Sequence, residues 1–208
     1  MTASTTAPTA ASATLRQVSG LDDRLPRFAD TALVLIDFQH TYTTGVMALE
    51  GAQEALAAGA RLLAAARAAG VPVIHIVNDG GAGTPYDISA EIGAICAEVA
   101  PIDGEPVVVK RVPNGFHDTK LEQTLRELGA GTELVLAGFM THMCVTFTAE
   151  GAFYRGYRPT VVAEATATRS LPGPDGAVLP AAALQTAALT TIADLFGTVV
   201  ATVDELTA

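Results

Sequence analysis

The chain of 208 residues has no tryptophan, only two cysteines and only four histidines, and 16% of its residues are charged. Two cysteines are too few for a disulfide framework and suit a reducing, cytoplasmic location. No apolar run approaches the roughly 18 residues of a membrane span, and the N-terminus lacks the basic and apolar regions of a secretory signal. We therefore expect a cytoplasmic protein without a membrane partner.

Positive charge is also scarce, because 12 lysines and arginines stand against 22 acidic residues and the net charge is −10. A nucleic-acid backbone requires the opposite sign, so we expect no nucleic-acid partner. No pair of histidines has metal-ligand spacing next to a carboxylate, and we predict neither a metal nor another cofactor. Half of the residues are hydrophobic, and the length suits one domain with a sizeable core.

Strand and helix signals alternate along most of the chain. Apolar runs predict six strands, at Ala32–Ile36, Val73–Val77, Val107–Lys110, Leu134–Ala137, Thr160–Ala163 and Thr198–Thr202. Helical patterns lie between most of them, at Gly51–Ala69, from Thr119 to about Leu128, Thr141–Arg155 and Pro180–Phe196. This order predicts a Rossmann-like three-layer α/β/α fold with a six-stranded parallel sheet.

The beginning of the chain differs in composition from the rest. Met1–Ser19 consists mostly of alanine, threonine and serine and has neither helical nor strand periodicity. We expect residues 1–30 to form a flexible arm and residues 31–208 to form the folded domain. Thr119-Lys120-Leu121-Glu122 matches a capping box at the start of a helix.

Three residues with useful chemistry fall at the carboxyl ends of predicted strands. Asp37 follows the first strand, Lys110 closes the third, and Cys144 begins the helix after the fourth. In parallel sheets these ends meet at one edge, where ligands bind. With Thr141 as the helix N-cap, free N–H groups and the Lys110 ammonium would favour a thiolate at Cys144. Asp37 would take the thiol proton and return it to a leaving amine.

Other residues near these three could complete the site. The backbone N–H groups of Met140 and Cys144 are the candidates for an oxyanion hole. Candidate substrate-binding residues are Gln39, Tyr42, Phe116, Phe139 and His142. The predicted reaction is attack of sulfur on an amide carbonyl, formation of a thioester and its hydrolysis, with a small amide-type molecule as the substrate.

Three segments together resemble the isochorismatase-like cysteine hydrolase superfamily, which includes nicotinamidases and N-carbamoylsarcosine amidase. The segments are Leu35-Ile36-Asp37-Phe38-Gln39, Val109-Lys110-Arg111-Val112-Pro113-Asn114-Gly115-Phe116 and Gly138-Phe139-Met140-Thr141-His142-Met143-Cys144-Val145. The resemblance spans about residues 31–203. It implies a catalytic triad of Asp37, Lys110 and Cys144, a cis peptide between Phe139 and Met140, and a homodimer or homotetramer. Streptothricin hydrolase, which opens a cyclic amide, is a similar member.

The chain departs from the nicotinamidases at one place. Their Asp-x-His metal motif is replaced by Asn78-Asp79-Gly80-Gly81, which argues against zinc and against nicotinamide as the substrate. We therefore predict a cysteine amidohydrolase for a small amide, lactam or ureido compound. The alternatives are an isochorismatase-type vinyl ether hydrolase and a catalytically silent binding homologue. A nucleotide-binding oxidoreductase would need Gly-x-Gly-x-x-Gly where the chain has Asp37-Phe38-Gln39-His40.

Overall fold

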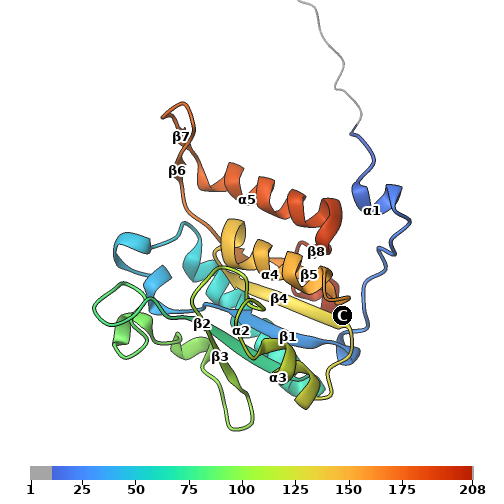
Figure 1. Ribbon diagram of the computed structural model, residues 1–208, viewed down its shortest axis with the longest axis horizontal. Helices are drawn as coiled ribbons and strands as arrows, with labels where there is room; N and C mark the ends of the chain where they lie inside the picture. The colour runs from blue at the N-terminus through green and yellow to red at the C-terminus, as the bar shows by residue number, and fades with distance from the viewer. Residues whose placement is uncertain (1–10, 208) are drawn as a thin grey trace, which may run out of the picture.

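Six parallel strands form the centre of the molecule in the computed structural model, which describes residues 11–207 (Figure 1). The sheet order is β3-β2-β1-β4-β5-β8. The strands are β1 Ala32–Ile36, β2 Val73–Asn78, β3 Val107–Lys110, β4 Glu133–Phe139, β5 Arg158–Ala167 and β8 Thr198–Val200. The predicted three-layer α/β/α fold with a six-stranded parallel sheet is confirmed.

Helices cover both faces of this sheet. The α-helices are α1 Leu15–Val18, α2 Ala52–Ala69, α3 Leu121–Glu127, α4 Thr146–Phe153, α5 Ala181–Thr191 and α6 Asp204–Thr207. Two π-helical segments are η6 Thr141–Val145, directly before α4, and η7 Ile192–Phe196, directly after α5. Short 3-10 turns are η1 Phe28–Asp30, η2 His40–Tyr42, η3 Gly45–Met47, η4 Glu91–Gly93 and η5 Ala97–Val99. In Figure 1, α5 lies outside α4, and the hairpin of β6 Leu171–Pro172 and β7 Val178–Leu179 projects beyond it.

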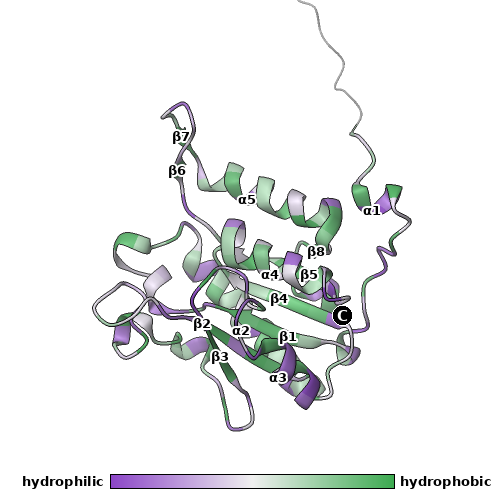
Figure 2. Cartoon of the chain, viewed as in Figure 1, coloured by the Kyte–Doolittle hydropathy of each residue, from purple (hydrophilic) through white to green (hydrophobic). Residues whose placement is uncertain are grey.

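The strands supply a core on each face because successive side chains point to opposite sides. Leu33 and Leu35 of β1 pack in the core that includes α2, whereas Val34 and Ile36 pack in the core that includes α3 and α4. All of β1 is buried, as expected for a central strand covered on both faces. Figure 2 shows hydrophobic strands in the middle of the molecule, with hydrophilic residues in α3 and in the loops.

The start of α3 differs from the sequence prediction. Lys120, not Thr119, occupies the N-cap position, and its side chain makes no capping hydrogen bond. The Thr119 hydroxyl accepts from Leu121 N at 3.2 Å and donates to Gly115 O at 2.6 Å. The predicted capping box is therefore wrong, because the hydroxyl bonds two residues ahead in a turn and not three.

Strand β5 is longer than predicted, and this change affects the site. Its pairing with β4 shifts register, since Leu136 pairs with Val161 but Gly138 pairs with Thr166. The irregularity lets β5 continue to Ala167 beside the end of β4. The segment after β5 is thereby carried to the edge of the sheet where β4 ends. The chain after β5 then forms the short antiparallel hairpin of β6 and β7.

The N-terminal segment contains one helix that periodicity did not predict. Helix α1 has a capping box formed by Thr14 and Gln17. With only four residues, the helix is too short to show a periodic pattern of apolar residues. Arg16 is buried, with its Nε 2.6 Å from Asp23 Oδ1 and its Nη1 donating to Leu195 O at 3.3 Å. The described part of the predicted arm is thus packed against η7. Its first ten residues lie outside the described residues, and the boundary at residue 31 stays a prediction.

A buried charge cluster connects α2, β2 and the loop before β3. Arg67 Nε lies 2.8 Å from Glu105 Oε1, and His75 Nε2 lies 2.9 Å from Glu105 Oε2. Burial raises the pKa of Glu105, but these donors outweigh burial and hold its pKa at about 2, against a usual 4.5. Because the folded pKa is lowered, this stabilisation is present above pH 4.5 and is lost as the pH falls toward 2.

We expect Glu105→Gln to lower the free energy of unfolding by about 2–3 kcal/mol at pH 7, and by progressively less toward pH 3. Urea unfolding at both pH values measures this effect. The matched control is Asp30→Asn, because the Arg27–Asp30 pair is exposed. That change should cost less than about 0.5 kcal/mol. Equal losses in the two variants would contradict the role of the buried cluster.

Candidate active site

Asp37 lies at the carboxyl end of β1, where the chain turns sharply. Its φ of 52° is in the left-handed region, which aspartate tolerates better than most residues. Its backbone N–H donates to Ile76 O at 2.9 Å, which anchors the turn to β2. The Asp37 carboxylate is fully buried, and neither oxygen has a hydrogen-bond partner among residues 11–207, although Oδ2 forms an ion pair with Lys110. A proton acceptor is thus held at the sheet edge, shielded from bulk solvent.

A glycine brings the end of β4 next to this turn. Gly138 pairs with Ile36 and has a φ of +133°, and a Cβ there would collide with the Ile36 carbonyl oxygen. Only glycine allows both the close approach and this backbone conformation. The peptide bond between Phe139 and Met140, at the end of β4, is cis. The chain then enters η6, which carries Cys144.

The ammonium of Lys110 joins the three predicted triad residues. Lys110 Nζ lies 2.7 Å from Asp37 Oδ2 and 3.3 Å from Cys144 Sγ. It also donates to Asn78 Oδ1 at 3.2 Å. Lys110 is 1% exposed and Cys144 is 5% exposed, so the three groups interact in a nearly dry environment. The structure therefore brings Asp37, Lys110 and Cys144 together at the carboxyl edge of the sheet.

The helical start at Cys144 differs from the prediction. Met140 occupies the N-cap position of η6, and no side chain caps it. The predicted N-cap Thr141 is instead the first helical residue, and its buried hydroxyl has no partner within the described part of the chain. The assignment of Thr141 as N-cap is wrong because the helical segment begins one residue earlier than the pattern indicated.

The charges around the sulfur also differ from expectation. Burial, reinforced by the Asp37 carboxylate, raises the pKa of Cys144 to about 12 although Lys110 opposes the shift. Burial raises the pKa of Asp37 as well, and the Lys110 charge only partly offsets it. Burial lowers the pKa of Lys110, but Asp37 and Cys144 in their ionised forms outweigh this and raise it. These shifts favour a thiol beside an ammonium in the resting site, and the thiolate at Cys144 stays a prediction.

Two of the predicted substrate-binding aromatics lie together. The ring centroids of Tyr42 and Phe139 are 5.8 Å apart, and Tyr42 also contacts Tyr86 at 5.9 Å. Burial, and then the negative charges of Asp37 and Cys144, raise the pKa of Tyr42 and keep its hydroxyl protonated. His142 is half-buried, with its Nδ1 2.5 Å from Thr168 Oγ1.

The other two predicted substrate-binding residues have different surroundings. Gln39 is fully buried, and its amide is occupied by backbone groups: it donates to Asn78 O at 3.1 Å and Gly93 O at 2.7 Å, and accepts from Asn78 N at 2.8 Å. Phe116 stacks on Tyr157 with a centroid distance of 5.7 Å, and Tyr157 precedes the amino end of β5. Gln39 therefore holds loops in place and Phe116 packs in the core, as the buried Tyr42 and Phe139 do on the other face of the sheet, and the substrate-binding roles of all four stay predictions.

Two polar residues near the triad were missed from the sequence. Asn78 ends β2 and contacts Lys110. Arg169 follows β5, and its buried Nε has no hydrogen-bond partner within residues 11–207. Burial, and then the positive charge of Arg169, lower the pKa of His142, which places Arg169 close to η6. The position of Asn78 at a strand end was a usable signal, whereas Arg169 was hidden by the underestimated length of β5.

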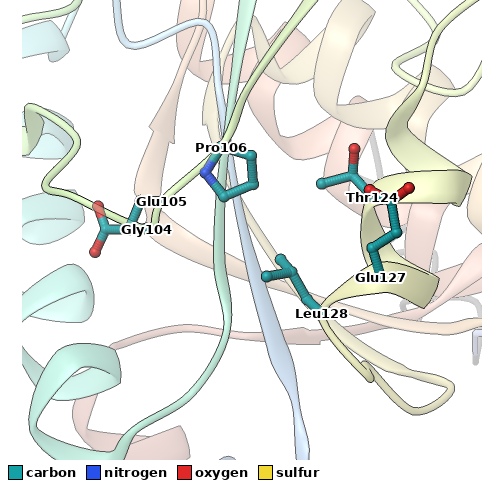
Figure 3. A pocket seen from close by; sticks show the side chains of 6 residues that line it. All are labelled: Gly104, Glu105, Pro106, Thr124, Glu127 and Leu128. Atoms are coloured by element: carbon teal, nitrogen blue, oxygen red, sulfur yellow. The ribbon is translucent and has the colours of Figure 1, made fainter.

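Cavities lie at both ends of β3, the amino end and the carboxyl end. Figure 3 shows one of about 400 Å³ between the loop before β3 and α3, lined by Gly104, Glu105, Pro106, Thr124, Glu127 and Leu128. It lies at the amino ends of the strands and thus away from the triad. A smaller cavity of about 160 Å³ adjoins Lys110 at the carboxyl end of β3, lined by Val109, Lys110, Arg111, Val112, His117 and Asp118.

Residues 11–207 contain no group of three or more histidine, cysteine, aspartate or glutamate residues that could hold a metal ion. No helix in this range is long and apolar enough to cross a membrane. The predicted cytoplasmic location and the predicted homodimer or homotetramer stay predictions.

Known proteins provide an independent comparison. The profile of the Isochorismatase domain family matches residues 31–204. The secreted isochorismatase effector Isc1 of Verticillium dahliae is 35% identical over 91% of this chain and 97% of its own length. Streptothricin hydrolase of Streptomyces noursei is 35% identical over 85% of this chain and 64% of its own length. The crystal structure of an isochorismatase from Pseudomonas putida KT2440 superposes with a TM-score of 0.89, at 39% identity, over 94% of this chain and 100% of that one.

Proposed function

This chain belongs to the isochorismatase family, and on that premise we propose that it is a cysteine amidohydrolase that cleaves a C–N bond of a small amide, lactam or ureido compound. The observation that carries the proposal is the position of Lys110 Nζ, 2.7 Å from Asp37 Oδ2 and 3.3 Å from Cys144 Sγ. A nucleophile, a base and a fixed cation in contact are what acyl transfer from an amide requires.

The first half of the reaction uses all three groups. Asp37 takes the thiol proton as Cys144 Sγ attacks the amide carbonyl carbon, so no free thiolate has to accumulate at a pKa of about 12. The raised pKa of Asp37 makes it a stronger base for this transfer than an exposed aspartate. Lys110 stabilises the negative charge as it passes from the carboxylate to sulfur. The backbone N–H groups of Met140 and Cys144 are the proposed donors to the oxyanion.

The second half releases the products. Asp37 returns its proton to the nitrogen, the C–N bond breaks, and an amine or ammonia leaves the acyl group as a thioester on Cys144. Asp37 then takes a proton from a water molecule that attacks the thioester, and the acid leaves as the thiol is restored. Each proton taken by Asp37 is thus returned, and the three side chains end as they began.

The alternatives are less well supported by the site. A vinyl ether can be hydrolysed without a sulfur nucleophile, and the contact of Cys144 with Lys110 would then have no role. A silent binding homologue would not need Asp37, Lys110 and Cys144 in mutual contact. The relative named streptothricin hydrolase supports C–N chemistry for this chain, although the chain spans 64% of that protein.

The proposal is tested by incubating the protein with a panel of primary amides, lactams and carbamoyl compounds and measuring released ammonia, amine or acid. We expect turnover of at least one compound. Hydrolysis of a vinyl ether with no amide turned over would contradict the proposal and support the isochorismatase-type alternative.

Arg169 narrows the class of substrate that we propose. Among residues 11–207, no carboxylate lies within 4.0 Å of its guanidinium nitrogens, and Nη1 contacts only Met47 Sδ, at 3.6 Å. A half-buried cation close to His142 of η6, with no carboxylate partner among residues 11–207, suits an amide that also carries an anionic group.

We expect Arg169→Gln to raise the KM of a carboxylate-bearing amide by about tenfold or more, because a hydrogen bond to a charged group is lost. The KM of a neutral analogue of the same amide should change less than about twofold. Arg111→Gln is the matched control, since Arg111 is an exposed arginine of the same sheet edge that already pairs with Asp79 at 3.0 Å. Equal effects on charged and neutral amides would remove the case for an anionic substrate.

A further inference from the structure

Lys110 has a third partner that the proposed mechanism leaves without a role. Asn78 ends β2, the strand between β3, which ends at Lys110, and β1, which precedes Asp37. The two residues are direct partners in the β2–β3 register, and Asn78 Oδ1 accepts from Lys110 Nζ at 3.2 Å. Asn78 therefore contacts the ammonium from the end of β2, whereas Cys144 contacts it from the segment after β4.

The hydrogen-bond count explains why the third partner matters. A lysine ammonium has three N–H donors and no acceptor, so the amide atom that faces it must be the oxygen. The Lys110 ammonium donates to Cys144 Sγ and to Asn78 Oδ1 and forms an ion pair with Asp37 Oδ2, so three groups surround it. Without Asn78, one N–H of a residue that is 1% exposed would lose its acceptor, and the ammonium would be free to turn away from the sulfur.

The backbone of Asn78 is itself held by a side chain from the turn that follows β1. Gln39 Oε1 accepts from Asn78 N at 2.8 Å, and Gln39 Nε2 donates to Asn78 O at 3.1 Å. Gln39 lies two residues after Asp37, so one side chain connects the turn that carries the base to the residue that holds the ammonium. A chain of contacts thus runs from Gln39 through Asn78 to Lys110 and on to Asp37 and Cys144.

We propose that Asn78 is a positioning residue of the reaction, which fixes the Lys110 ammonium between the Asp37 carboxylate and the Cys144 sulfur. This inference rests on the proposed function. A neutral acceptor is required at this place. An aspartate would have the same shape, but it would put a second carboxylate on Lys110 and leave the buried group with an excess negative charge, which opposes the growth of charge on sulfur.

The test compares Asn78→Leu, which keeps the size and removes the acceptor, with Asn78→Asp, which keeps the acceptor and adds a charge. For Asn78→Leu we expect kcat to fall about 10- to 100-fold, the loss of one hydrogen bond to a charged group, with KM changed less than about twofold. For Asn78→Asp we expect the acid limb of the kcat profile to move to higher pH, because the second carboxylate makes Asp37 harder to ionise.

A second readout does not need turnover. The rate of Cys144 alkylation by iodoacetamide, followed by mass spectrometry between pH 7 and pH 10, should fall several-fold in both variants because the thiolate loses stabilisation. Asp79→Asn, the neighbouring residue with an exposed arginine partner, is the control and should leave both readouts unchanged.

The outcomes separate the positioning role of Asn78 from the proposed amidohydrolase function. Slower alkylation in both Asn78 variants, in a protein that turns over no amide, would support the positioning role while contradicting the proposed function. Wild-type alkylation and wild-type kcat in Asn78→Leu would overturn the positioning role even if amides are hydrolysed. If Asn78→Leu does not fold, Asn78→Ser replaces it, because the shorter serine side chain moves the acceptor away from the ammonium. Asn78→Ser is then compared with Asn78→Asp in the same way.

Discussion

Replacing Cys144 with alanine is expected to abolish turnover, with kcat reduced by at least about 10⁴-fold, because sulfur is the atom that forms the bond to substrate. The melting temperature should change by only a few degrees, since the side chain is small and its removal leaves little space. Activity assays with the compound found in the amide panel, together with thermal unfolding, measure both effects.

The matched control is Cys96→Ala, because Cys96 is the other cysteine of the chain and is also buried. Burial raises its pKa to about 11, but the described residues near it include no lysine ammonium, and its closest polar contact is His40 Nδ1 at 3.9 Å. This variant should keep its kcat and lose about 1 kcal/mol of stability. Turnover that survives in Cys144→Ala would refute covalent catalysis.

Replacing Lys110 with methionine is expected to have the second largest effect. Methionine fills a similar volume but leaves the buried Asp37 carboxylate without its counter-charge, so kcat should fall by about 10³-fold or more. The pKa of Asp37, already raised by burial, should rise further. When the pKa of a carboxyl group is higher in the folded than in the unfolded protein, the group stabilises the fold at pH values below the unfolded-state pKa. This contribution is lost as the pH rises through the pKa of the folded state.

The stability of Lys110→Met should therefore decrease with rising pH, by about 3 kcal/mol relative to wild type at pH 8 and by much less at pH 4.5. Urea unfolding at the two pH values measures the difference. The double variant Asp37→Asn with Lys110→Met removes both charges and should recover most of the stability at pH 8 without recovering activity. A pH-independent loss, or no recovery in the double variant, would show that the pair does not interact as described.

The fold could be predicted largely because its strands are continuous apolar runs. Ala32–Ile36 is buried on both faces, so its sequence carries a strong signal, and the predicted and observed bounds coincide. The 10-residue β5 was underestimated because its register shift places the partly exposed Ala163 and Glu164 in the middle of the strand. An irregular pairing of this kind depends on the neighbouring strand and leaves no periodic pattern in the sequence.

The site was predictable where it depended on topology. Asp37, Lys110 and Cys144 lie in contact because parallel strands bring their carboxyl ends to one edge, and the order of elements was enough to infer this. Side-chain directions were not predictable. Phe116 and Tyr42 each follow a strand end and both turn into the core, but on different faces of the sheet: Phe116 stacks on Tyr157, whereas Tyr42 packs against Phe139. Local sequence does not determine which way a loop side chain points.

The ionisation of Cys144 depends on quantities that a sequence does not contain. The pattern identified the favourable contributions, a lysine and a helix start, but it could not weigh them against burial. At 5% exposure, burial and the Asp37 carboxylate together exceed the effect of Lys110 and raise the thiol pKa to about 12. The proposed mechanism therefore couples proton transfer to attack.

Trapping the acyl-enzyme is the measurement that tests the central claim most directly. The protein is mixed with an amide that it turns over, quenched in acid within the first turnover, digested and analysed by mass spectrometry. The account predicts that the peptide containing Cys144 gains the mass of the substrate minus its amine, that the adduct is lost on a longer incubation, and that Cys96 stays unmodified. Full turnover with no adduct on Cys144 at any time, at a rate unchanged in Cys144→Ala, would contradict it.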